Sequence, residues 1–214
     1  MNKLICVLLI VLLVSACNDS SVKQEALRFK EEYESLNGKE NDSGIDYVNV
    51  VIEADHPMVY ADIEQLLEVI KNDGIIYFGF DECPWCRNVL PVLIEAAREK
   101  EVSEIYYYDI KGIRDELVLN EEGMIEVMKE KSEDYQLIYD ALYDSLNIYE
   151  GLNDDTIKRL YAPSVFFIKE GKVMLMHEST VESQKDPSVM MSDVQQHQLK
   201  DIYIQGIEKI TEAF

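Results

Sequence analysis

The sequence has little positive charge. Its 214 residues include 20 Lys and Arg against 42 Asp and Glu, so the formal net charge is −22 at pH 7. No basic stripe offsets this excess along the chain, although binding to the phosphate backbone of DNA or RNA depends on positive charge. The composition therefore excludes nucleic acid as a partner.

Long hydrophobic runs are also scarce, and the one present lies at the N-terminus. The 11 residues from Leu4 to Val14 follow Lys3 and are too short to cross a hydrocarbon core of ~30 Å, which predicts a signal peptide over residues 1–16. The run ends in Val-Ser-Ala-Cys, which resembles the lipobox of bacterial lipoproteins. This resemblance implies cleavage before Cys17 and lipidation of its thiol. The alternative is an ordinary signal peptide followed by an unrelated cysteine.

Cysteine is sparse as well, with four residues in the chain. Cys6 leaves with the signal peptide and Cys17 is the lipidation site, so Cys83 and Cys86 are the two thiols left for chemistry. Acyl chains on a cysteine hold a protein stably at a membrane surface. We therefore expect an extracytoplasmic protein, lipid-anchored to the bacterial cell membrane.

Apolar residues, in contrast, are plentiful. They make up 47% of the chain and include 13 Tyr and 6 Phe, which is enough for a packed core and argues against disorder. The length suits one medium domain. The predicted division is a signal peptide (1–16), a lipidated cysteine with a tether and N-terminal helix (17–44), and an α/β domain (45–214) with an insertion at about 111–161.

The hydrophobic pattern predicts alternating helices and strands. Alternating three- and four-residue spacing of apolar residues from Val22 to Leu36 predicts a first helix, and Asp62 with Gln65 forms a capping box for another. The expected strands are 45–52, 58–61, 74–80, 104–110, 165–168 and 172–176. The other expected helices run from 84 to about 100, through most of 111–161, and from Ser192 toward the C-terminus.

The chemistry is expected at Cys83-Pro84-Trp85-Cys86, directly after a buried strand and at the start of a helix. A helix N-terminus offers free backbone N–H donors and partial positive charge, which lower the pKa of a thiol. We expect Cys83 to be exposed and to attack a substrate disulfide, and Cys86 to be turned inward and to resolve the mixed disulfide.

Other roles for the thiol pair stay open at this point. An inert disulfide is one, and half of a zinc site is another, although the three histidines are scattered along the sequence. A copper-binding dithiol is a third, because Met174, Met176, Met190, Met191 and His177 offer further soft or imidazole ligands.

Further residues make the chain resemble the thioredoxin-fold family. Pro91 lies five residues after Cys86, and Ala162-Pro163-Ser164 precedes VFFIKEGKV, a strand, glycine turn and strand. The resemblance covers roughly 58–110 and 161–214. It implies a central mixed β-sheet flanked by helices, with a helical insertion before the strand that follows the cis-proline.

The same resemblance assigns the site. It implies a redox-active Cys83–Cys86 disulfide without metal or cofactor, and a cis Pro163 against the cysteine pair. The neighbouring backbone at Ala162 would then pair with a substrate chain, with Pro84 and Trp85 beside it. The chain departs from thioredoxins at Tyr77, where they carry a buried proton-relaying Asp, so another group must take the proton of Cys86; Glu126 and Glu130 in the insertion are candidates.

Two acidic features leave alternatives open. Asp81 and Glu82 precede Cys83, and their charge either opposes the helix dipole or is lost to solvent. The acidic insertion is either a solvated face or a wall that favours cationic substrates, as in the bacteriocin accessory thioredoxin-like proteins that this chain is similar to.

The sequence thus predicts a thiol–disulfide oxidoreductase that acts on disulfide-bearing proteins or peptides and is recycled by a membrane redox partner. The alternative is a non-enzymatic lipoprotein that uses the dithiol for copper or partner binding.

Overall fold

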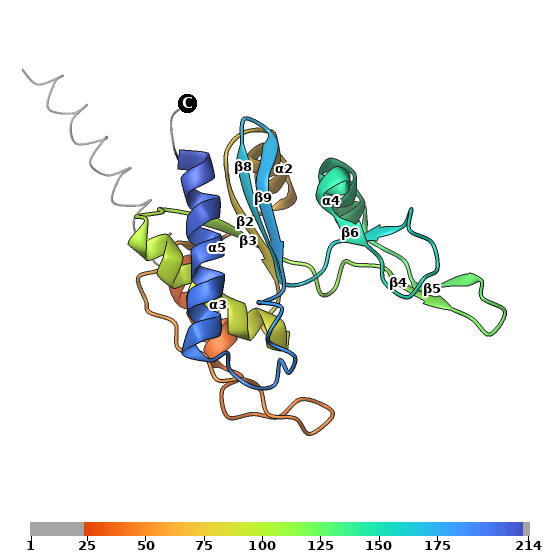
Figure 1. Cartoon of the computed structure of the whole chain (residues 1–214), viewed down its shortest axis with the longest axis horizontal. Helices are drawn as coiled ribbons and strands as arrows, with labels where there is room; N and C mark the ends of the chain where they lie inside the picture. The colour runs from red at the N-terminus through yellow and green to blue at the C-terminus, as the bar shows by residue number, and fades with distance from the viewer. Residues whose placement is uncertain (1–23, 212–214) are drawn as a thin grey trace, which may run out of the picture.

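The computed structural model describes residues 24–211 and forms a mixed α/β fold (Figure 1). The predicted signal peptide and Cys17 lie outside the described residues. Residues 24–34 are helical. The strands are β1 (Met58–Tyr60), β2 (Gly74–Gly79), β3 (Ile105–Asp109), β4 (Glu116–Leu119), β5 (Ile125–Lys129), β6 (Asn147–Ile148), β7 (Lys158–Arg159), β8 (Ser164–Lys169) and β9 (Lys172–Glu178). The helices are α2 (Ile63–Lys71), α3 (Pro84–Glu99), α4 (Glu133–Leu142), the 3-10 turn η1 (Tyr143–Ser145) and α5 (Asp193–Thr211).

Five strands form the central sheet in the order β1-β3-β2-β8-β9. β1, β3 and β2 are parallel, whereas β8 is antiparallel to both β2 and β9. The two central strands, β2 and β8, are rich in apolar residues and almost entirely buried, as expected of strands covered on both faces. The predicted central mixed sheet flanked by helices is confirmed.

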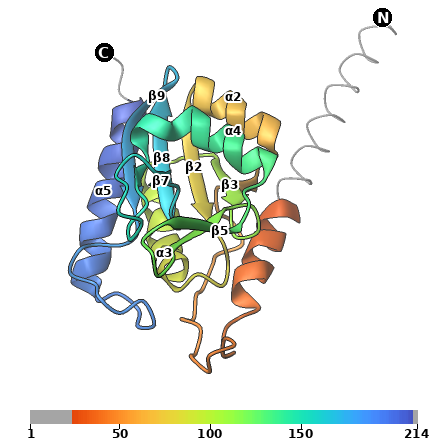
Figure 2. The same cartoon turned by 90° about the vertical axis from the view of Figure 1, so that its right-hand side faces the viewer.

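The two faces of the sheet are covered by different helices (Figures 1 and 2). α3, α5 and the helical residues 24–34 pack on one face, where Phe29, Tyr33 and Cys86 share a single core cluster. α2 and α4 pack on the other face, where their apolar side chains meet those of Phe78 and Phe166. Each helix buries its apolar stripe against the sheet, which is the main stabilising contribution.

Short-range signals define the ends of several helices as predicted. The Asp62 side chain accepts a hydrogen bond from the backbone of Gln65, whose side chain accepts one from Asp62 in return. In α5, a side chain at Gly206 would clash with the Phe167 ring, since a Cβ there would lie 2.5 Å from a ring carbon. Glycine therefore allows α5 to lie close against β8.

The predicted strand over 45–52 is wrong. Apart from an isolated bridge between Asp46 and Glu40, this segment pairs with no strand, and side chains satisfy the backbone of its second half. Asn37 exchanges two hydrogen bonds with Val50, and Glu34 accepts one from the Ile52 N–H. Phe29 and Tyr33 lie in the main core, so the helical residues 24–34 pack against the α/β domain.

The mainly helical character predicted for 111–161 is also wrong. α4 is capped by Ser132 as predicted, but the rest of the segment forms the hairpins β4–β5 and β6–β7 together with η1. The β4–β5 turn is built on Asn120, whose side chain accepts from the N–H groups of Glu122 and Met124, with Gly123 at φ +78°. This turn chemistry favours a hairpin over a helix.

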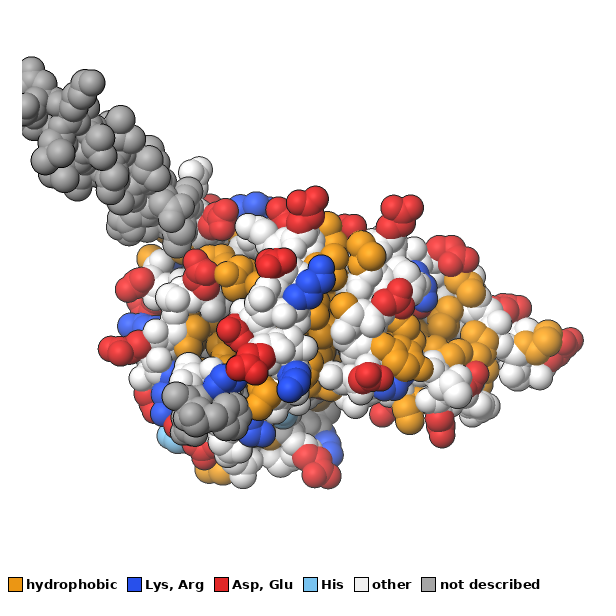
Figure 3. All heavy atoms as spheres, turned by 90° about the horizontal axis from the view of Figure 1, so that it is seen from above, with side chains coloured by type: hydrophobic (Ala, Val, Ile, Leu, Met, Phe, Trp, Pro, Cys, Tyr) orange, Lys and Arg blue, Asp and Glu red, His pale blue; other side chains and the backbone are white. Residues whose placement is uncertain are grey.

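The hairpin β4–β5 projects away from the sheet (Figure 1) and carries exposed apolar side chains, with Met128 63% and Met124 57% exposed. Acidic side chains are spread over the face seen in Figure 3, with hydrophobic ones gathered toward the end that holds this hairpin. Within residues 24–211, no helix has the length and apolar character needed to cross a membrane.

Candidate functional site

The cysteine pair lies where strand β2 passes into helix α3. Cys83 is the N-cap of α3 and Pro84 occupies its first turn, where the missing N–H of proline costs nothing. The backbone N–H of Cys86 donates to Cys83 Sγ over 3.2 Å. Both cysteines are free thiols. Cys83 is only 5% exposed and Cys86 is fully buried, so the expectation of an exposed first thiol is wrong.

The surroundings of Cys83 favour its thiolate. Burial disfavours the charged form, but hydrogen bonds from the Cys86 thiol and from the backbone N–H groups of Cys86 and Trp85 outweigh it. The positive charge of Arg114 adds to this effect, and together these groups lower the pKa of Cys83. Cys83 is therefore the thiol that is ready to attack.

The surroundings of Cys86 favour its neutral thiol. Burial raises the pKa of Cys86 well above its usual range, and the hydrogen bond and negative charge of Cys83 raise it further. A hydrogen bond from Tyr77 acts in the opposite direction. The pKa of Cys83 is therefore lowered and that of Cys86 raised, so Cys83 loses its proton first and Cys86 needs a proton acceptor before it can react.

The cis-proline prediction is confirmed. The Ala162–Pro163 peptide bond is cis, and the Cys83 thiol donates to the Ala162 carbonyl over 3.6 Å. Pro163 is buried and its carbonyl accepts from Ser179, whereas Ala162 is half-buried. Of the two other predicted contact residues, Pro84 is exposed and Trp85 is half-buried against the core.

The acidic residues before Cys83 differ from each other. Glu82 is exposed and forms an ion pair with Lys111, which offsets its charge. Asp81 is half-buried, and burial raises the pKa of its carboxyl. Its backbone carbonyl accepts from Arg87. The negative charges of Asp81 and Glu82 therefore oppose the dipole of α3 less than two free carboxylates would.

Two arginines escaped the sequence reasoning. Arg114 acts on Cys83 from the segment after β3, and its guanidinium also lies 5.5 Å from the Phe80 ring centre. Arg87 directly follows Cys86 and is fully buried. It donates to the carbonyls of Val48, Tyr33 and Asp81 and to the Asn37 side chain. The sequence does contain a signal for Arg87: it is a charged residue at a position that the apolar pattern of α3 assigns to the buried face.

The proposed proton acceptors in the insertion are placed unfavourably. Glu126 lies exposed on β5 and accepts a hydrogen bond from Asn120. Glu130 is exposed at the end of the same hairpin. Because the hairpin projects from the sheet while Cys86 is fully buried, neither carboxylate is suited to accept its proton.

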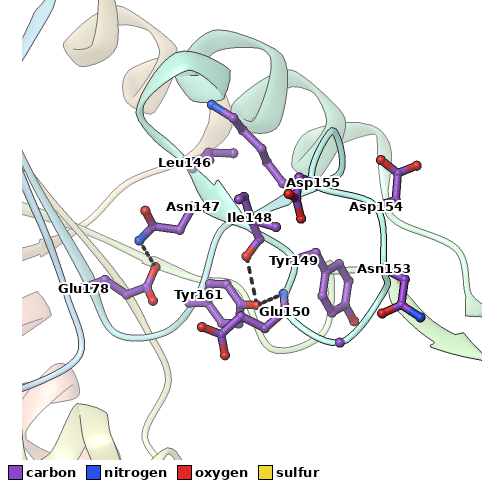
Figure 4. A pocket seen from close by; sticks show the side chains of 12 residues that line it. Leu146, Asn147, Ile148, Tyr149, Glu150, Asn153, Asp154, Asp155, Tyr161 and Glu178 are labelled. Carbon is purple, nitrogen blue, oxygen red and sulfur yellow. Dashed lines mark hydrogen bonds between the residues drawn. The ribbon is translucent and has the colours of Figure 1, made fainter.

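A pocket of about 690 Å³ is lined by residues between 146 and 161, which precede the cis-proline, and by Glu178 of β9 (Figure 4). The Tyr161 hydroxyl accepts from the Glu150 N–H and donates to the Ile148 carbonyl, which holds the pocket wall together. Four carboxylates line it, those of Glu150, Asp154, Asp155 and Glu178. Eleven of its twelve lining residues belong to the acidic insertion, for which a solvated face and a substrate wall are both open.

Among residues 24–211, no group of three or more His, Cys, Asp or Glu side chains is arranged to hold a metal ion. No protein-family model, no curated protein and no solved structure matches the chain. The geometry of the cysteine pair is therefore the basis for assigning a function.

Proposed function

We propose that the protein is a thioredoxin-like thiol–disulfide oxidoreductase. The observation that carries the proposal is the unequal pair of thiols beside a cis-proline. Cys83 has a lowered pKa at the start of α3, Cys86 has a raised one, and the Ala162 carbonyl lies 3.6 Å from Cys83 Sγ. An attacking thiolate followed by a protonated, buried thiol is the order that disulfide exchange requires.

In the proposed reaction, the Cys83 thiolate attacks one sulfur of a substrate disulfide. The substrate S–S bond breaks, one substrate sulfur leaves as a thiolate, and a mixed disulfide forms with Cys83. Cys86 then loses its proton and attacks Cys83 Sγ, which releases the second substrate thiolate and leaves a Cys83–Cys86 disulfide. The pair is oxidised by two electrons and the substrate is reduced by two; the reverse sequence oxidises a substrate dithiol.

Substrate is proposed to bind as an extended segment along Ala162. Its half-buried backbone lies against Cys83, and the exposed Pro84 and half-buried Trp85 flank the same thiol. Backbone pairing of this kind recognises an extended chain rather than one side chain. The substrates are therefore disulfide-bearing proteins or peptides.

The test is capture of the mixed disulfide. In Cys86→Ser protein, covalent adducts with substrate should accumulate and be released by reductant, because no thiol is left to resolve them. Cys83→Ser is the matched control and should form none. A purified protein that neither reduces nor oxidises a model disulfide, or that takes up one equivalent of Cu(I) without any exchange, would overturn the proposal in favour of a binding role.

We also propose that Cys17 carries a lipid and tethers this domain outside the cytoplasm, where a membrane redox partner resets the pair. The basis is the resemblance of residues 14–17 to a lipobox. Cys17→Ser should abolish incorporation of labelled fatty acid and release the protein from the membrane fraction. Labelling that persists in this variant would contradict the assignment.

A further inference from the structure

Three buried tyrosines, one of them on the N-terminal helical residues 24–34, lie in the core cluster that holds the active-site thiols. Tyr33, Tyr77 and Tyr107 are each at most 1% exposed. The hydroxyl oxygens of Tyr33 and Tyr77 are 3.4 Å apart. The rings of Tyr33 and Tyr107 pack edge to face with centres 6.3 Å apart, and Tyr33 acts to lower the pKa of Tyr107. Buried hydroxyls in contact can both donate and accept, so such a cluster is able to pass a proton along its length.

One end of the cluster is at Cys86. Tyr77 and Cys86 are fully buried in the same core cluster, and the Tyr77 hydroxyl acts to lower the pKa of the Cys86 thiol. Tyr77 stands at the sequence position where thioredoxins carry a buried Asp. The Tyr77 hydroxyl occupies space that Gly79 leaves open, since a Cβ at Gly79 would lie 2.6 Å from that oxygen. The phenol is a poor final acceptor because burial raises its pKa well above the usual value. A carboxylate beyond it is needed.

The other end of the cluster is Glu32. Tyr107 donates to Glu32 Oε1 over 3.2 Å, and Tyr60 donates to Oε2 over 2.6 Å. Burial raises the pKa of Glu32 above that of an ordinary carboxyl, which makes it a better base. Glu32 also lines a pocket of about 430 Å³, so a proton received there has a route to solvent.

We propose that the proton of the Cys86 thiol leaves the core through tyrosine hydroxyls and is accepted by the Glu32 carboxylate. The relay consists of Tyr77, Tyr33 and Tyr107. This inference rests on the proposed function, because it concerns the resolving step of disulfide exchange. The final proton acceptor, Glu32, then lies on the N-terminal helical residues 24–34, whereas thioredoxins use a buried acid next to the cysteines.

The proton balance of the step is simple. Cys86 gives its proton to the Tyr77 hydroxyl as its sulfur attacks Cys83, each hydroxyl passes one proton onward, and the Glu32 carboxylate ends protonated. The tyrosines are unchanged after the transfer. When the Cys83–Cys86 disulfide is reduced again, the same path returns the proton to Cys86.

Both ends of the relay have charged or titratable neighbours. Those around Glu32 are Arg28, Tyr60, Asp62, Asp81, Tyr107, Asp109 and Asp134. Those around Cys86 are Tyr33, Tyr77, Cys83, Arg114 and Tyr203. The acidic groups near Glu32 favour its protonated form, as needed for an acceptor that must take up a proton.

The test uses the reduced protein and a chromogenic aromatic disulfide in a stopped-flow instrument. The first thiolate released reports attack by Cys83, and the second reports attack by Cys86. In Glu32→Gln we expect the first phase to be unchanged and the second to slow by about 10-fold or more at neutral pH. Tyr77→Phe and Tyr33→Phe should slow the same phase.

The pH profile separates a relay from a structural effect. In the wild-type protein the second phase should fall as pH drops through the ionisation of Glu32, because only the carboxylate accepts a proton. This inflection should be absent in Glu32→Gln. Infrared difference spectra between the oxidised and reduced protein should also contain the band of a protonated carboxyl, which Glu32→Gln removes.

Two matched controls are available. Tyr203 is buried near Cys86, and its hydroxyl has no hydrogen-bond partner among the described residues, so Tyr203→Phe should leave the second phase intact. Glu31 is the exposed neighbour of Glu32, and Glu31→Gln should have no effect.

The outcomes distinguish the relay from the function beneath it. Absence of both phases in the wild-type protein would overturn the oxidoreductase proposal and the relay with it. Two wild-type phases, with a second phase in Glu32→Gln that stays within about 2-fold and keeps its pH inflection, would overturn the relay alone. Equal slowing in Tyr203→Phe and Tyr77→Phe would also overturn it.

Discussion

Two segments outside the central sheet reach the cysteine pair, and they do so differently. The N-terminal segment, residues 24–52, places Phe29, Tyr33, Val50 and Ile52 in the core cluster that also holds both cysteines. The segment 110–163 carries α4 on the opposite face and extends into an exposed hairpin. From the first segment, the Tyr33 hydroxyl lies 3.4 Å from that of Tyr77 on the Cys86 side; from the second, the charge of Arg114 acts on Cys83.

The difference separates two tasks of a disulfide-exchange site. A resolving thiol must be shielded and still able to lose a proton, so the segment that serves it is buried and rich in hydroxyl groups. An attacking thiol must be charged and must be reached by substrate. The segment that serves it therefore supplies the positive charge of Arg114 and the exposed surface of the hairpin β4–β5. We therefore expect substitutions of the buried residues in 24–52 to cost stability, and those of Arg114 and of the exposed hairpin β4–β5 to change reactivity or nothing.

The largest effect is expected at Phe29. Its ring is fully buried and packs against Tyr33 and Tyr107, with ring centres 4.8 and 4.9 Å away. Phe29→Ala should lower the free energy of unfolding by about 3–5 kcal/mol, measured by urea denaturation. Leu27→Ala is the control on the same helical residues, since Leu27 is 47% exposed. Equal losses of unfolding free energy in the two variants would show that burial of Phe29 does not stabilise the fold.

The next effect is expected at Arg87, which ties residues 24–52 to α3. Arg87→Met leaves the buried Val48 carbonyl without its donor and the Tyr33 carbonyl with only the long hydrogen bond from the Leu36 N–H. The free energy of unfolding should fall by about 2–4 kcal/mol in the same urea assay. Arg98→Met, at an exposed position of α3, should change it by less than about 0.5 kcal/mol. A loss below about 1 kcal/mol for Arg87→Met would show that other contacts hold the segment.

A smaller effect, on reactivity rather than stability, is expected at Arg114. Its positive charge favours the Cys83 thiolate, so Arg114→Gln should raise the pKa of Cys83 and leave less thiolate at neutral pH. The rate of Cys83 alkylation by iodoacetamide should then fall by about 3-fold or more at neutral pH and approach the wild-type rate at high pH. Arg114→Lys keeps the charge and should restore most of the rate. An unchanged pH profile in Arg114→Gln would remove Arg114 from the site.

The smallest effect is expected on the hairpin β4–β5. Met128 is 63% exposed and Val127 is 50% exposed, so little apolar surface is lost when either is shortened. Met128→Ala and Val127→Ala should each change the free energy of unfolding by less than about 0.5 kcal/mol and leave exchange with a small aromatic disulfide unchanged. A loss near that of Phe29→Ala would place the hairpin in the folded core and erase the contrast between the two segments.

Sequence reasoning succeeded where the signal was local. The burial of Ala26, Phe29 and Tyr33, the capping box of α2 and the start of α3 at the cysteine pair all depend on residues within one or two turns. It failed for 45–52 because side chains from the preceding helix replace the strand partner that the Val- and Ile-rich pattern predicts. It failed for 116–129 because the two strands are short, and a turn built on the Asn120 side chain joins them into a hairpin where the sequence predicts helix.

The sequence by itself determined that two thiols lie one helical turn apart at the end of a buried strand, and that a proline-led strand and glycine turn follow downstream. Spacing alone is sufficient for this, because the residues involved are neighbours along one strand and one helix. Only the tertiary structure decided which groups surround those thiols. Arg114 beside Cys83 and Tyr33 beside Tyr77 come from segments far apart along the chain, and they meet because the sheet brings those segments to the same side chains.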